Sequence, residues 1–69
     1  MSRLKEELDR AGISAAKLAE ILGVHANSVY GWIDGKYEPN GRNLVQLSSI
    51  LGCSPDYLLG LTDSRTKTR

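Results

Sequence analysis

The sequence is poor in the features that mark secreted and membrane-embedded proteins. It has a single cysteine, Cys53, so no disulfide can form within the chain and nothing favours secretion. No apolar run approaches the roughly 20 residues that cross a bilayer. The first ten residues carry charge throughout, unlike a signal peptide. The sequence therefore predicts a cytoplasmic protein in a reducing environment, with no membrane partner.

Groups of residues that carry catalysis or bind metals are also missing from the sequence. We find no paired carboxylates, no Ser-His-Asp set and no glycine-rich phosphate loop. The one histidine, His25, has no Cys or His partner at metal-ligand spacing, which favours a place at a helix start or facing a phosphate. We therefore expect no enzyme, no metal site and no cofactor.

Apolar residues recur at helical spacing, and nowhere do they alternate with polar residues as in a strand. The chain has 69 residues, 41% hydrophobic and 25% charged, which is ordinary for one small globular domain. The pattern predicts an all-α fold, a compact bundle of five helices over residues 3–11, 15–22, 25 or 26 to 33 or 34, 41–51 and 55–59. Residues 1–61 form the predicted domain, and residues 62–69, which lack apolar side chains, are expected to be a flexible basic tail.

The predicted helices have recognisable starts and charged surfaces. Ser14, Asn40 and Ser54 are good N-caps, because their side-chain oxygens can accept a free backbone N–H. In the first helix, Arg3 with Glu7 and Glu6 with Arg10 stand four residues apart and are expected to pair on a solvated face.

The stretch AKLAEILGVHANSVYGW, residues 16–32, holds two helical patterns separated by Gly23. Ala19 is small where the helices would cross, and Gly23 permits a positive φ in the turn. Val29 and Trp32 anchor the second helix from beneath. This arrangement leaves the outer face of that helix free, and the major groove of DNA, about 12 Å wide, admits one helix. The pattern is typical of a helix-turn-helix.

The segments LAEILGV, DGKYEPN and LGCSPDYLLG carry a resemblance to phage repressor and Cro-type helix-turn-helix domains, the XRE family, which covers residues 3–60. The resemblance implies a lambda-repressor-like five-helix bundle that binds operator DNA as a dimer. The sequence departs from the family pattern at Ala15, where members often carry glutamine, and at Ala26 and Gly31, where they often carry polar reading residues.

Five residues of the third predicted helix are candidates for base readout. Asn27 is the first choice, because an asparagine amide can pair with the edge of adenine, although it can also be a solvated helix-start residue. Ala26 offers a methyl to thymine or simply favours a helix, and Ser28 can contact a base, contact a phosphate or cap. Tyr30 lies opposite Val29, where a large exposed aromatic favours a contact. Gly31 either lets the backbone approach DNA or is merely tolerated.

Phosphate contacts are expected where basic residues and helix N-termini come together, since free N–H groups and the helix dipole attract anions. These residues lie at the start of the second helix, at the start of the third and around the loop before the fourth: Ser14, Ala15, Lys17, His25, Lys36, Asn40, Arg42 and Asn43. Such contacts fix register and supply salt-dependent affinity without reading sequence.

Apolar residues near the C-terminus exceed what one short helix need bury, and the resemblance implies dimer contacts there, at Pro55, Leu59 and Leu61. Alternatively this segment closes the core, at least through Tyr57 and Leu58. The predicted function is a sequence-specific transcriptional repressor that binds a palindromic operator in double-stranded DNA as a homodimer. The modest net charge of +1 leaves a protein-interaction module, such as an antitoxin or anti-repressor partner, as the alternative. Both a whole Cro-sized protein and the DNA-binding part of a longer repressor fit the length.

Overall fold

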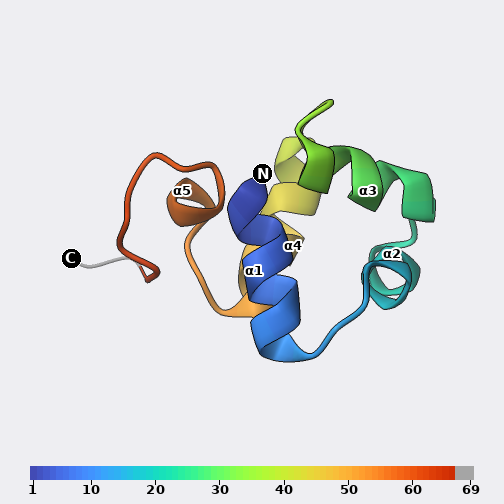
Figure 1. Cartoon of the computed structure of the whole chain (residues 1–69), viewed down its shortest axis with the longest axis horizontal. Coiled ribbons are helices and arrows are strands. Elements are labelled where there is room, and N and C mark those ends of the chain that lie inside the picture. Colours follow the sequence, from blue (N-terminus) through green and yellow to red (C-terminus); the bar gives the residue numbers. More distant parts are fainter. Residues whose placement is uncertain (67–69) are drawn as a thin grey trace.

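The computed structural model of the chain describes residues 1–66 and confirms an all-helical fold. Its five helices are α1 (Ser2–Ala11), α2 (Ala15–Leu22), α3 (Ala26–Asp34), α4 (Gly41–Leu51) and α5 (Pro55–Leu58). In Figure 1, α1 lies centrally, with α2 and α3 on one side of it and α5 with the C-terminal segment on the other. No helix of this part of the chain is long and apolar enough to cross a membrane.

The helix starts follow local capping rules, and the expected caps all form. The side-chain oxygens of Ser14, Asn40 and Ser54 accept the backbone N–H of the residue three positions further on, at 2.9–3.1 Å. Each cap satisfies one of the N–H groups that a helix leaves without an internal partner. The helix bounds consequently agree with the predicted ones within one residue at each end.

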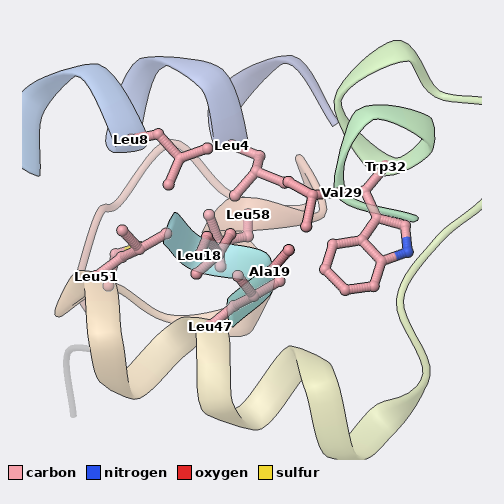
Figure 2. Close-up of a cluster of buried hydrophobic side chains, with 10 residues drawn as sticks. Leu4, Leu8, Leu18, Ala19, Val29, Trp32, Leu47, Leu51 and Leu58 are labelled. Carbon is pink, nitrogen blue, oxygen red and sulfur yellow. The ribbon is translucent and has the colours of Figure 1, made fainter. Parts of the chain in front are cut away.

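The core draws at least one buried side chain from every helix (Figure 2). Leu18, Val29 and Leu47 are fully buried, and Trp32 is only 3% exposed. Ala19, the small residue expected where α2 and α3 cross, is buried in the core as well. Because these side chains come from different helices, the orientation of α3 depends on the packing of the whole domain.

Glu7 of α1 is buried, which overturns the expectation that all the charges of this helix are solvated. It is 2% exposed, and its carboxylate accepts hydrogen bonds from Nη2 and Nε of Arg65 at 2.7 and 3.0 Å. The Arg65 guanidinium holds the pKa of the Glu7 carboxyl below its ordinary value, although burial alone would raise it. The expected pairs of Arg3 with Glu7 and of Glu6 with Arg10 do not form among residues 1–66.

Residues 62–66 lie against the helices, where the sequence predicts a flexible tail. The N–H of Ser54 donates to the carbonyl of Arg65 at 2.8 Å, and Nη2 of Arg65 donates to the carbonyl of Leu51 at 3.1 Å. Arg3 of α1 also reaches this segment, with Nη2 2.6 Å from Oδ1 of Asp63. The sequence did not predict this packing, because Arg65 pairs with the carboxylate of Glu7, which lies 58 residues away in the chain. Residues 67–69 of the predicted tail lie outside the described residues.

Candidate nucleic-acid interface

A tight turn over residues 23–25 joins α2 to α3. Gly23 has φ +72° and ψ +32°, the left-handed conformation that glycine adopts without steric cost. The next residue, Val24, donates its N–H to the carbonyl of Ala19 at 3.0 Å, which closes the end of α2. The side chain of Val24 packs against the core, so the turn is held in one conformation. The chain therefore enters α3 in a direction fixed by backbone bonds and by packing.

The inner face of α3 is anchored firmly in the core. Val29 is 0% exposed and Trp32 is 3% exposed, and Figure 2 shows both pointing toward the side chains of the other helices. The amino group of Met1 donates to the carbonyl of Trp32 at 2.8 Å, so the N-terminus of α1 also holds α3. These contacts prevent α3 from rolling about its own axis.

The outer face of α3 is open to solvent. Asn27, Tyr30 and Asp34 are exposed, and half of the Tyr30 surface is accessible. Two other candidates for base readout, Ala26 and Ser28, are half-buried at the margins of this face. The structure thus brings the predicted reading residues onto one helix and leaves Asn27 and Tyr30 the most accessible of them. A contact between any of them and a base stays a prediction.

Gly31, the fifth candidate, lies beneath the ring of Tyr37 and is buried. A Cβ atom at this position would stand only 2.3 Å from Cζ of Tyr37. Close approach of an aromatic ring therefore explains the glycine, which sequence reasoning attributed either to DNA approach or to tolerance. The ring of Tyr37, which is half exposed, covers Gly31 in the structure, and Tyr37 is not among the residues singled out from the sequence.

His25 occupies the N-cap of α3. Its Nδ1 accepts the N–H of Asn27 at 3.1 Å, and its carbonyl accepts the N–H of Ser28 at 2.9 Å. Of the two expectations for this residue, the structure gives it the helix-start position.

The residues expected to contact phosphate lie at the starts of α2, α3 and α4, except Lys36, which follows the C-terminal end of α3. Ser14 and Asn40 use their side-chain oxygens as caps, and Ala15 and Asn43 are half-buried. The ammonium of Lys17 is 3.6 Å from a Glu20 carboxylate oxygen. Lys36 and Arg42 are exposed and make no ion pair with any of residues 1–66, so their charges are available to a phosphate.

The residues expected at a dimer contact lie around α5. Leu61 is 73% exposed, whereas Pro55 and Leu59 are half-buried. Leu58 is 1% exposed and belongs to the core, which agrees with the alternative interpretation for that residue. An exposed leucine beside partly covered neighbours leaves a small apolar patch at this end of the molecule.

The buried inner face of α3, its exposed polar outer face and the tight turn from α2 define a helix-turn-helix domain. The comparisons agree with that class: the chain belongs to the helix-turn-helix family, whose model matches residues 4–58. This family is the one that the sequence resemblance indicates.

Curated relatives with repressor or regulator names cover most of this chain. It is 40% identical over 57 residues to Repressor protein C2 of Salmonella phage P22, with 83% of this chain and 26% of the phage protein covered. It is 39% identical to the SPbeta prophage-derived uncharacterized HTH-type transcriptional regulator YonR of Bacillus subtilis, with 83% and 53% covered. The third, HTH-type transcriptional regulator DicA of Escherichia coli, is 45% identical over 61% of this chain and 31% of its own length. The chain therefore spans about a quarter to about half of these relatives. No solved structure matches it.

Proposed function

We propose that this domain is the DNA-binding unit of a transcriptional repressor, and that it recognises a palindromic operator as a dimer with α3 in the major groove. The observation that carries the proposal is the contrast between the two faces of α3. Val29 and Trp32 fix the inner face, while Asn27 and Tyr30 project from the outer face. Helix-turn-helix proteins place such a helix in the major groove, with its N-terminal residues against base edges.

In the proposed complex, each exposed group has a separate role. The Asn27 amide pairs with a base edge, and the Tyr30 hydroxyl reaches a neighbouring base or a phosphate. Lys36 and Arg42 neutralise phosphates on either side of the groove, and the N-terminus of α4 adds its dipole. Such contacts make the affinity fall steeply as salt concentration rises.

Dimerisation in this proposal uses the patch of Pro55, Leu59 and Leu61. Because α3 and α5 lie on opposite sides of α1 in Figure 1, a twofold axis beside α5 would keep the two copies of α3 well apart. Half-sites of one operator lie about 34 Å apart, one turn of the duplex. A dimer also doubles the contacts that a domain of this size can make with DNA. Operator binding would place the protein in the cytoplasm of a bacterial cell.

The test is selection of bound duplexes from a random DNA pool at two salt concentrations, first with the unaltered chain. We expect a palindromic preference and a steep salt dependence. Asn27→Ala should lose discrimination at particular base pairs, since one good base contact contributes about 1–3 kcal/mol. Arg42→Ala is the matched control: it should weaken all sequences alike and reduce the salt slope by about 1. An unchanged base preference in Asn27→Ala would refute its assigned role, and a shallow salt dependence would count against the DNA function.

A protein-interaction module is the second candidate, and Asp34 is the observation that favours it. This carboxylate is exposed on the outer face of α3, where it would face the phosphates of a duplex, and the net charge is only +1. A partner protein with a basic surface would fit such a face. Absence of any selected DNA sequence, together with a stable protein complex formed without DNA, would support this candidate over the repressor.

A further inference from the structure

Tyr37 occupies the space that a side chain at Gly31 would fill. A Cβ atom built on Gly31 would lie 2.3, 2.5 and 2.7 Å from Cζ, Oη and Cε1 of the Tyr37 ring. All three separations are far below a van der Waals contact, so no other residue fits at position 31 while the ring stays in place. The ring comes from the loop after α3, six positions further along the chain.

Backbone contacts bring this loop back over the helix. Gly35 ends α3 with φ +80°, and the N–H of Lys36 donates to the carbonyl of Gly31 at 2.9 Å. The Tyr37 hydroxyl then donates to the carbonyl of Asn27 at 3.2 Å, one helical turn before Gly31. Tyr37 is thus held across two successive turns of α3, and half of its surface remains exposed.

The exposed half of the ring shares a surface with the side chain of Asn27. Residues 27 and 31 stand four apart and therefore lie one above the other on the same face of a helix. The loop thus adds the ring of Tyr37 to the outer face of α3 at Gly31, the position that has no side chain of its own. The hydroxyl is already engaged by a carbonyl, so the free part of the ring is mostly apolar.

We propose that Tyr37 is a specificity-determining residue: with α3 in the major groove, its ring takes the place of the side chain missing at Gly31 and contacts the methyl group of a thymine. This inference rests on the function proposed above. The chemistry favours thymine, because its C5-methyl is the apolar group that base pairs present in the major groove. The thymine is expected beside the base pair that Asn27 contacts.

Replacing thymines by uracil one at a time in the selected half-site tests the contact, since uracil lacks only the methyl group. Affinity of the unaltered protein should fall about fourfold at one position, the amount expected when a group of one carbon leaves an apolar contact. Tyr37→Ala should bind the thymine and uracil duplexes equally at that position. Tyr37→Phe, which keeps the ring and loses the bond to Asn27, should still discriminate between them.

Gly31→Ala supplies an independent variant, because its methyl group must displace the ring. We expect it to lose the thymine preference as Tyr37→Ala does, with circular dichroism showing that both variants remain folded. A purely structural role for Tyr37 would weaken binding to both duplexes by the same factor, and that result would overturn the inference while leaving the repressor function intact. A half-site without a methyl-sensitive thymine would overturn it too. If the unaltered chain selects no DNA sequence, both proposals fail together.

Discussion

Replacing Arg65 by methionine should destabilise the domain at neutral pH, because the buried carboxylate of Glu7 loses the guanidinium that pairs with it. Arg65→Met keeps an apolar stem of similar length and removes the guanidinium that donates to Glu7 at 2.7 and 3.0 Å. A hydrogen bond to a charged group contributes about 1.5–3 kcal/mol, and the low end applies to Glu7 because solvent reaches the 31% exposed side chain of Arg65. In a domain of this size, the melting temperature should fall by about 6–12 °C.

The effect should depend on pH in a defined direction. Arg65 lowers the pKa of Glu7 in the folded state, so the stabilisation is complete above the ordinary pKa of a glutamate. It is lost as the pH falls through the lowered pKa, where Glu7 becomes protonated in the native protein as well. In Arg65→Met, burial without the guanidinium raises the pKa of Glu7, so the difference in melting temperature should begin to shrink above the ordinary glutamate pKa and shrink further as the pH falls through the lowered pKa of the unaltered protein. Other carboxyl groups titrate in both proteins and cancel in the difference.

Thermal unfolding followed by circular dichroism from pH 7 to pH 2.5 measures this difference. Lys5→Met is the matched control, because its ammonium lies 3.4 Å from Asp9 in an ion pair whose side chains are 65% and 69% exposed. Exposed i,i+4 pairs contribute at most about 0.5 kcal/mol, so we expect its melting temperature to change by about 4 °C at most. Equal melting temperatures for Arg65→Met and the unaltered protein at pH 7, or a difference that does not vary with pH, would refute the reasoning.

Three further predictions concern packing, capping and association. Leu47 is fully buried, so Leu47→Ala should lower the free energy of unfolding, measured by urea titration, by about 2.7–5 kcal/mol. The control Val45→Ala, on the exposed side of α4, should change it by less than about 0.5 kcal/mol. Ser54→Ala removes the cap of α5 and should cost about 1 kcal/mol by the same measurement; no loss would show the cap bond to be dispensable. Leu61→Asp should weaken dimerisation in sedimentation experiments and leave the melting temperature of the monomer unchanged, and an unaltered dimer would place the contact elsewhere.

Local rules were enough to predict the helices from the sequence. Ser14, Asn40 and Ser54 cap as expected because the cap and its N–H partner are only three residues apart. The inner face of α3 was predicted for a similar reason: Val29 and Trp32 stand three apart, and helical periodicity alone puts them on one side. Such features depend on the neighbouring residues and hardly on the tertiary fold.

Long-range pairing of charges could not be predicted in the same way. The sequence offered Glu7 an arginine four residues away, Arg3, yet the partner in the structure is Arg65. A solvated pair at i, i+4 gains only a few tenths of a kcal/mol, whereas an acid that folding buries must find a partner to stay charged. Arg3 is drawn instead to Asp63 and lies over the ring of Tyr57, 4.4 Å from its centroid. The burial of Glu7 thus favours its pairing with Arg65, which the local spacing of charges does not reveal.

The candidate interface depends both on local helical geometry and on contacts with a segment outside the helix. Helical geometry places Asn27 and Tyr30 on the outer face of α3, as expected, whereas the packing at Gly31 involves Tyr37 of the loop and could not be deduced from the helix alone. A glycine inside a helix costs about 1 kcal/mol relative to alanine, so its presence indicates that something needs the space. The chain offered a signal for what that is: an aromatic residue, Tyr37, in a turn-rich segment directly after the helix. Gly35 ends α3 in the left-handed conformation, and the N–H of Lys36 then donates to the carbonyl of Gly31, which turns the loop back over the helix. The outer surface of α3 is therefore built jointly by the helix and its following loop, so in the proposed complex substitutions confined to the helix would test only part of the contact with DNA.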